Sequence, residues 1–404
     1  MRIIILNADY PRFLARLYQS QAGLENASYA AQMEVRNASL FGLANFYSRN
    51  FVALGHMAAE IHVNNRFMQS AWAREHGIAI ELGDASAEAP HHRLPGWLQR
   101  AAAPFKPILR PLVRKVGLSP RLDEASEQIL LAQIEAFKPD VVLNQDVFYV
   151  DVPLMRRIRE IGRPLLIGQI GVEPSRGVDW SAYDLMVSQL PRLARLFRGS
   201  TRAEVVHLAF EPSVLAALPP APEQDVDISF VGSVSEDHKQ RIGLLEAVAR
   251  RYDLKMWGSI PRSLPSTSPL HGCFQGEVWG AEMYQTLRRS RITLNSHIDI
   301  AGSEAGNMRL FEATGAGAFL LTDFKENLHT LFEPDREVAV WRTVEGCLDA
   351  IDHFLADADR RATIARAGQA KTSSQHTYRH RVSELLQLIE ALRNERSASQ
   401  RRRI

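Results

Sequence analysis

Short apolar runs alternate with amphipathic stretches along the first half of the chain. Arg2 to Leu6, Val141 to Leu143 and Leu165 to Ile170 are apolar runs of strand length. Such runs are typical of strands that are buried on both faces of a parallel sheet. Leu122 to Phe137 instead repeats its apolar side chains at helical spacing. Strands that alternate with helices predict a doubly wound α/β domain.

The pattern also predicts a helix from Ser39 to Ala58 and a short strand from Ile78 to Leu82. A proline-rich linker follows the first alternating series, because Pro219, Pro220 and Pro222 cannot continue a helix or a central strand. A second series of strands and helices begins after the linker. The predicted limits are 1–218 for the first domain, 219–227 for the linker, 228–376 for the second domain and 377–404 for a last helix with a basic tail.

Acidic side chains follow two of the predicted strands of the first domain. Asp9 comes after the first strand, and Asp146 comes after Val141 to Leu143. Open α/β sheets bind ligands at the carboxyl ends of their strands. Asp146 and Asp9 are therefore the candidate catalytic residues. A carboxylate in such a place can serve as general base toward a hydroxyl group, or it can only hold a sugar.

Ser303 to Asp323 is the most informative stretch of the chain. Its pattern predicts a loop, a helix, a turn and a buried strand. Asn307 is the expected N-cap of the helix, and Gly315 and Gly317 are expected to end it. Because a helix N-terminus exposes unpaired N–H groups, this one is a natural site for a diphosphate.

Two carboxylates, Glu304 and Glu312, frame this helix with seven residues between them. With Glu304 in the loop, both side chains can face one ligand that lies across the helix N-terminus. Carboxylates accept hydrogen bonds from sugar and ribose hydroxyls. The alternative is one glutamate in a loop and one on the surface of a helix.

The paired glutamates, the glycine-containing turn and the apolar strand resemble the donor-site signature of retaining GT-B glycosyltransferases. Asn307, Arg309, Phe311 and Glu312 form the longer string NxRxFE, which resembles the C-terminal domain of the CgeB-like, spore-maturation-type glycosyltransferases. The resemblance covers roughly Val226 to Leu388 well and the first half only in outline. It implies a GT-B fold, in which two Rossmann-like domains face a cleft and the last helix crosses back to the first domain. It also implies a nucleotide-sugar donor.

The resemblance implies further donor-site residues in the second domain. Gly232 and Ser233 end a strand, and Lys239 and Arg241 open the next helix, as in the GT-B loop that contacts the donor diphosphate. Arg309 is a third candidate cation, and the alternative for all three is a solvated helix side chain. Trp257, Gly258 and Ser259 are further candidates, because their backbone groups can contact the base of the donor, although the Trp can equally be structural. His297 is the last candidate, and it can touch the donor sugar.

In the first domain the sequence departs from the family outline. Related GT-B enzymes often carry a histidine where Asp146 stands here, so the resemblance leaves the mechanism open. No DxD motif occurs at a strand end, which predicts transfer without a metal. No cofactor is expected, because the nucleotide sugar is a co-substrate. The expected acceptor is a polysaccharide, a glycolipid or another surface glycan. Alternatives are a sugar-nucleotide epimerase with the GT-B fold and a non-catalytic nucleotide-sugar-binding protein.

Composition places limits on partners and location. The net charge of the 404-residue chain is only +2, which gives no signal for nucleic acid. Two cysteines at unrelated positions predict a reducing compartment. No apolar run approaches the roughly 18 residues of a membrane span, and we expect a cytoplasmic protein. Arg93 to Arg121 mixes basic and apolar residues without an acid. It predicts peripheral contact with the inner face of the membrane, or else a solvated insertion interrupted by prolines.

Overall fold

Two parallel sheets organise the protein, a computed structural model that describes residues 1–80, 82, 121–174, 177–220, 222–236 and 238–401. Within these ranges the first sheet has six strands in the order β2-β1-β3-β4-β5-β6, and every pairing is parallel. The strands are β1 Arg2–Asn7, β2 Met57–His62, β3 Val141–Asn144, β4 Leu165–Gln169, β5 Leu185–Ser188 and β6 Ala203–Val205. The α/β class and the parallel sheet predicted from the apolar runs are confirmed.

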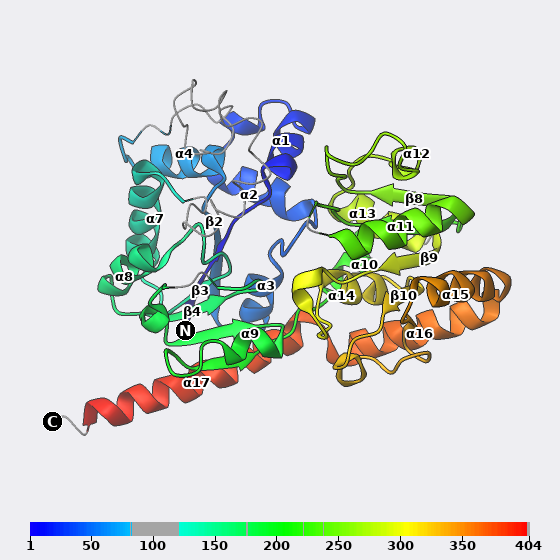
Figure 1. The fold of residues 1–404 in the computed structure, drawn as a ribbon. Helices are drawn as coiled ribbons and strands as arrows, with labels where there is room; N and C mark the ends of the chain where they lie inside the picture. Colours follow the sequence, from blue (N-terminus) through cyan, green and yellow to red (C-terminus); the bar gives the residue numbers. More distant parts are fainter. Residues whose placement is uncertain (81, 83–120, 175–176, 221, 237, 402–404) are drawn as a thin grey trace.

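Helices cover both faces of this sheet (Figure 1). Those of the first half are α1 Pro11–Ser20, α2 Tyr29–Ala38, α3 Phe46–Ala53, α4 Arg66–Glu75, α7 Glu124–Phe137, α8 Val152–Glu160, α9 Pro191–Arg195 and α10 Ser213–Ala217. Val141, Leu143 and Ile167 are buried on the face of the sheet that α3 covers. Leu130 and Ile134 of α7 pack on the other face.

The predicted helix from Ser39 to Ala58 is wrong in its first part. A turn separates α2 from α3 there, and Leu40 and Ala44 have positive φ angles of 59° and 39°. Such backbone cannot belong to a right-handed helix. The apolar side chains of the turn, including Leu40, instead pack against the large core beside α3.

The predicted strand from Ile78 to Leu82 is also wrong for the residues described there. Ile78, Ile80 and Leu82 form no sheet pairing, and they pack against Trp72 of α4. These apolar side chains are thus packed against helices and not in the sheet. The edge strand of the sheet is β2 instead.

The second sheet has five strands among the described residues, in the order β11-β10-β9-β7-β8, and all are parallel. They are β7 Val226–Val231, β8 Leu254–Trp257, β9 Ser290–Asn295, β10 Leu320–Asp323 and β11 Ala339–Trp341. The helices are α11 Lys239–Arg251, α12 Leu270–Cys273, α13 Gly280–Arg288, α14 Met308–Gly315, α15 Val344–Ala356, α16 Ala358–Gln375 and α17 Tyr378–Arg401. The second alternating series is therefore confirmed, and β7 and β9 lie at the point where the strand order reverses.

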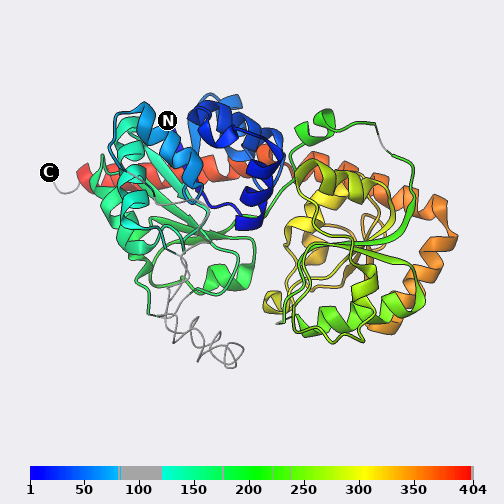
Figure 2. The same ribbon diagram turned by 90° about the horizontal axis from the view of Figure 1, so that it is seen from above.

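The chain passes between the two sheets at two adjacent places. Phe210 N donates to His376 O (2.9 Å), and Tyr378 N donates to Phe210 O (3.1 Å). α17 then runs back along the first domain and packs on α3, as Figures 1 and 2 show. The expected return of the last helix is thus confirmed. The predicted domain limits at residues 218, 227 and 376 stay predictions.

No helix in the described part of the chain is long and apolar enough to cross a membrane. The basic segment Arg93 to Arg121 lies outside the described residues except for its last residue. Arg121 forms an ion pair with Asp151 at 3.2 Å.

Candidate functional site

The loops that follow β7 and β8 lie side by side. Gly232 N donates to Trp257 O, and Val234 N donates to Ser259 O, both at 2.8 Å. Gly258 has a φ of 137°, and a Cβ there would lie 2.2 Å from the carbonyl oxygen of Gly232. Only glycine fits this approach. Sequence-predicted residues from two loops are thus brought together beside the reversal of the strand order, which lies between β7 and β9 and is where open sheets bind ligands.

α14 presents Arg309 and Glu312 beside these loops. Arg309 Nε donates to Val231 O at 3.1 Å, and its guanidinium pairs with the Glu312 carboxylate at 2.9 Å. Glu312 is only 6 % exposed. Burial raises the pKa of Glu312, and Arg309 opposes that shift. The alternative of a glutamate on a helix surface is therefore wrong.

Asn307 caps α14, as the sequence predicts. Its Oδ1 accepts from Leu310 N at 3.3 Å. Its amide also exchanges two hydrogen bonds with Asn295 at the end of β9, at 2.8 and 3.3 Å. The cap thereby fixes the first turn of α14 against the carboxyl end of the neighbouring strand.

Arg241 lies beneath the loops and not in front of them. Its guanidinium donates to Ser233 O (2.9 Å) and to Ser296 O, which joins the loops after β7 and β9. The side chain is buried. The prediction that Arg241 contacts a diphosphate therefore needs correction, because both of its terminal Nη groups are directed to backbone carbonyls. Lys239, two residues earlier, is exposed.

A cavity of about 520 Å³ opens at the carboxyl ends of β9, β10 and β11. Lys239 and His297 line it, together with backbone and side chains from the start of α15. Its charged lining residues are Lys239, Asp299, Asp323, Lys325 and Arg342.

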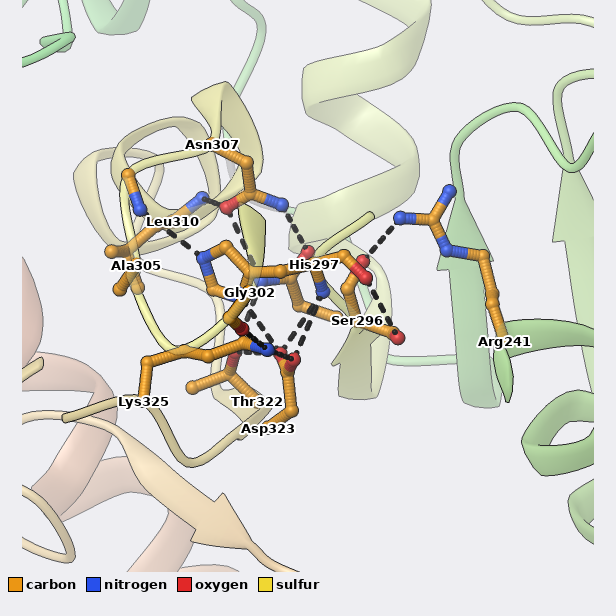
Figure 3. A network of polar contacts seen from close by, with 12 residues as sticks. Arg241, Ser296, His297, Gly302, Ala305, Asn307, Leu310, Thr322, Asp323 and Lys325 are labelled. Carbon is orange, nitrogen blue, oxygen red and sulfur yellow. Dashed lines mark hydrogen bonds and ion pairs between the residues drawn. The ribbon is translucent and has the colours of Figure 1, made fainter. Parts of the chain in front are cut away.

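His297 is the centre of the polar network in Figure 3. Its Nδ1 lies 2.7 Å from Asp323 Oδ1, and Gly306 N donates to its Nε2 at 3.3 Å. Nε2 is thus the acceptor of the Gly306 N–H group, and Nδ1 faces the Asp323 carboxylate. The ring is buried, so the prediction that His297 touches a sugar is replaced by a positioning role. It joins the ends of β9 and β10 to the loop before α14.

Asp323 is held in its ionised form by this network. Burial alone would raise its pKa, but His297 and Lys325 outweigh burial and lower it to about 2. Because the folded pKa lies below the ordinary value of 3.8, the ionised carboxylate stabilises the fold above about pH 4. That contribution is lost as the pH falls toward 2.

We expect Asp323→Asn to lower the free energy of unfolding by about 2 kcal/mol at pH 7. The difference from wild type should shrink at pH 3, where the wild-type carboxylate begins to lose its advantage. Urea unfolding at both pH values measures it, with the exposed Asp349→Asn as the matched control. A deficit of equal size at both pH values would show that ionisation of Asp323 does not carry the stabilisation.

Glu304 reaches the first domain. Both of its carboxylate oxygens accept from Arg192 N at 2.9 Å, and Arg195 lies 3.4 Å away. The carboxylate therefore caps the short helix α9. The expectation that both glutamates face one ligand is not met in this arrangement, because Glu304 has its hydrogen-bond partners across the domain boundary.

Asp146 is half-buried at the carboxyl end of β3. Its Oδ1 accepts from Phe148 N and Tyr149 N, both at 3.1 Å. Burial raises the pKa of Asp146, and the two backbone donors oppose that shift. Because Oδ1 alone accepts these bonds, Oδ2 is left for a ligand.

Asp9 is buried and already paired. Arg36 donates to its carboxylate, and His62 Nδ1 lies 3.0 Å from it. Burial would raise the pKa of Asp9, but His62 and Arg36 hold it well below its usual range. The prediction of Asp9 as a catalytic residue therefore needs correction. Its geometry is that of a support for the loop after β1.

A second contact joins the domains on the side of α1. Arg16 pairs with Glu282 at 2.6 Å, and Arg12 pairs with Glu277. The Trp279 ring of the second domain stands edge-on to Phe41 of the first, with 4.7 Å between the ring centroids. With the Glu304 contact, this arrangement holds the strand ends of the two sheets toward each other.

Sequence reasoning missed two glutamines at the carboxyl ends of first-domain strands. Gln169 follows Gly168 at the end of β4, and Gln189 follows β5 directly. Gln145 Nε2 donates to Gln169 Oε1 at 2.9 Å. The signal that could have found them is the same amide residue at the end of three successive apolar runs.

Comparison with known proteins identifies the fold of the chain. Residues 240–387 match the glycosyl transferase-like family. The glycosyltransferase from Rickettsia africae ESF-5 aligns over 97 % of this chain and 98 % of its own, with 12 % identity and a TM-score of 0.56. Sucrose-phosphate synthase from Thermosynechococcus elongatus aligns over 98 % and 100 %, with 11 % identity and a TM-score of 0.56. No curated protein matches the sequence.

A third similar structure is HepE from Anabaena, solved with UDP-glucose. It aligns over 97 % of this chain and 100 % of its own, with 11 % identity and a TM-score of 0.52. At these identities the likeness shows the fold alone. The protein has the GT-B fold, and the family match lies in its second half. Among the described residues no group of three or more His, Cys, Asp or Glu side chains is placed to hold a metal ion.

Proposed function

We propose that the protein is a glycosyltransferase that moves a sugar from a nucleotide-sugar donor to a hydroxyl group of an acceptor. The observation that carries the proposal is the meeting of two strand-end loops across the domain boundary. A Cβ at Gly306, next to the cap of α14, would lie 3.2 Å from Gln189 O of the first domain. A donor at α14 and an acceptor at the first sheet would therefore meet there. HepE, which shares the fold, binds UDP-glucose, which supports a uridine nucleotide sugar as donor.

The donor contacts follow from the positions of the side chains. The diphosphate is proposed to lie on the N-terminus of α14 with Lys239 as its counter-charge. Glu312 is proposed to accept from ribose hydroxyls, and the backbone at Gly258 and Ser259 to face the base. Because the helix end and Lys239 supply positive charge, transfer is proposed to need no metal. The CgeB-like assignment is proposed from the NxRxFE string.

The reaction step is proposed as follows. The acceptor hydroxyl oxygen forms a bond to the anomeric carbon while Asp146 takes its proton. The bond from the anomeric carbon to the phosphate oxygen breaks, and the nucleoside diphosphate leaves with that electron pair. The resemblance of the Glu304 and Glu312 pair to the signature of retaining enzymes supports retention of the anomeric configuration, in which the hydroxyl attacks on the same face of the sugar from which the phosphate leaves. Proton NMR coupling constants of the product test that choice, and an inverted product would overturn it.

The acceptor is proposed to be a surface glycan or glycolipid handled on the cytoplasmic side. Peripheral membrane contact through Arg93 to Arg121 is proposed from composition alone.

Binding of the donor can be tested by thermal shift against a panel of nucleotides and nucleotide sugars. A ligand at about 100 times its dissociation constant adds about 2.7 kcal/mol of stability, which is readily seen. Stabilisation by a nucleoside diphosphate and its sugar conjugate is expected. Stabilisation without any consumption of donor would favour a binding protein, and interconversion of free nucleotide sugars would favour an epimerase.

Lys239→Ala is expected to weaken nucleoside diphosphate binding about tenfold while nucleoside binding is unchanged, because only the phosphates would lose a charged partner. Arg241→Ala is expected to lower the melting temperature and to weaken both ligands alike, because the buried guanidinium joins two loops. Isothermal titration with UDP and uridine, together with thermal melts, measures both effects. An equal loss for UDP and uridine in Lys239→Ala would exclude its phosphate role.

A further inference from the structure

Three glutamines form one row along the strand ends of the first sheet. In the register of β3 and β4, Asn144 stands opposite Gly168, which places Gln145 opposite Gln169. Gln169 stands opposite Val187 in β5, so Gln189 lies two residues further along. Side chains two residues apart share a face of a sheet. Gln145, Gln169 and Gln189 therefore point to one face, and they are called the amide row below.

The amide row has hydrogen-bonding capacity to spare. Gln145 Nε2 donates to Gln169 Oε1, but no donor among the described residues reaches the buried Gln145 Oε1. Gly171 makes room for Gln189, because a Cβ there would lie 2.6 Å from Gln189 Nε2. All three glutamines are half-buried, so each has some exposed surface, although Gln145 Oε1 itself is covered. A buried amide oxygen without a partner is costly unless a water or a ligand completes it.

Among the described residues beside the amide row, the cations are already paired: Arg192 pairs with Glu173 and Arg195 with Glu304. Arg381, which lies near Tyr47 and His207, donates to Leu208 O and Glu384 and contacts His376 Nδ1. Burial and Arg381 lower the pKa of His207 to about 4, so its ring is neutral at pH 7. Asp146 follows Gln145 directly in the chain, at the end of the row away from Gln189.

The Gln189 end of the amide row lies against the loop before α14 of the second domain. A Cβ at Gly306 would lie 3.2 Å from Gln189 O and 3.4 Å from Gln189 Cγ. Gly306 in turn donates to His297 and precedes Asn307, the cap of α14. A ligand held along the row would therefore lie between Asp146 and the proposed place of the donor.

We infer that the amide row is the acceptor subsite and that it binds a neutral, hydroxyl-rich sugar unit. The inference rests on the proposed function and names its acceptor class. An amide carries both donors and an acceptor, which matches hydroxyl groups that donate and accept. An acceptor with a phosphate or carboxylate would meet the Asp146 carboxylate and paired cations, and its own charge would find no partner.

The test compares neutral and anionic acceptors with a donor that the thermal-shift panel has identified. Neutral probes are the methyl glycosides of glucose, galactose and N-acetylglucosamine. Anionic probes are methyl glucuronide and glucose 6-phosphate. Release of nucleoside diphosphate and mass spectrometry of the product report transfer, and at least one neutral glycoside is expected to be glycosylated in preference to both anionic probes.

Gln169→Ala should raise KM for the neutral acceptor about three- to tenfold, which is the loss expected for one neutral hydrogen bond. Donor KM and acceptor-independent donor hydrolysis should be unchanged. Gln128→Ala on the exposed face of α7 is the matched control and should change neither constant. A rise in donor KM of the same size would assign Gln169 to the fold or to the donor site, which overturns the inference.

The failures of the two proposals can be told apart. If no nucleotide sugar binds or is consumed, the proposed function fails and the acceptor inference falls with it. If donor is hydrolysed but the neutral glycosides are ignored, or if the anionic probes are preferred, the glycosyltransferase proposal stands and the amide-row inference is overturned.

Discussion

Asp146→Asn is expected to cut turnover by about 10²–10⁴-fold with donor affinity nearly unchanged, the range for loss of a general base. The variant should keep the local backbone structure, because asparagine Oδ1 can still accept from Phe148 N and Tyr149 N. Steady-state kinetics with a saturating donor measure the effect. Asp349→Asn, on the exposed face of α15, is the matched control.

The pH profile adds a second readout for Asp146. Burial raises the pKa of its carboxyl group, and only the ionised form can take a proton. Turnover should therefore rise with pH through a pKa above the ordinary value for aspartate, and the asparagine variant should lose this limb. If the variant changes only the acceptor KM, Asp146 holds the sugar and is not a base. If neither constant changes, the acceptor site lies elsewhere.

Glu312→Gln is expected to weaken the nucleotide-sugar donor by about 1.5–3 kcal/mol, or about 10- to 150-fold, as for hydrogen bonds to a charged group. The physical reason is that a neutral amide replaces the carboxylate proposed to accept from ribose hydroxyls. The effect should be equally strong for UDP, which carries the same ribose. Titration calorimetry with UDP and with uridine measures the loss of affinity, which should be a similar factor for both ligands.

The same variant carries a stability cost that must be measured beside it. Glu312 is buried and pairs with Arg309, and removing one partner of a buried ion pair is destabilising. Glutamine keeps the shape and one acceptor oxygen, so it is a better probe than alanine. The control is Glu345→Gln in the exposed first turn of α15. Wild-type donor affinity in a folded Glu312→Gln variant would remove Glu312 from the donor site.

Local pattern was sufficient for the elements of the second domain. The helix and strand predicted within Ser303 to Asp323 form α14 and β10, and Asn307 caps α14 as its residue type predicts. These features depend on neighbours in the sequence. In the first domain the turn after α2 was missed, because the positive φ angles of Leu40 and Ala44 follow from packing against α3 and have no local signal.

The roles of single side chains were harder to predict, because their partners are far away in the sequence. Glu304 bonds to Arg192, 112 residues earlier, and Asp9 is neutralised by Arg36 and His62 from two other elements. Arg241 looked like a free helix cation, but the face of α11 that carries it turns inward. Residue type and strand-end position thus located the region of the site, whereas tertiary packing decides which groups are left for a ligand.

The most direct test of the proposed sugar transfer is the stoichiometry of a single incubation. The protein is mixed with the nucleotide sugar that stabilises it and with a neutral methyl glycoside, and NMR follows all species. One nucleoside diphosphate should be released for each glycosylated acceptor formed. Conversion of the donor to an epimer without release of nucleoside diphosphate, or an unchanged donor despite tight binding, would contradict the proposed transfer.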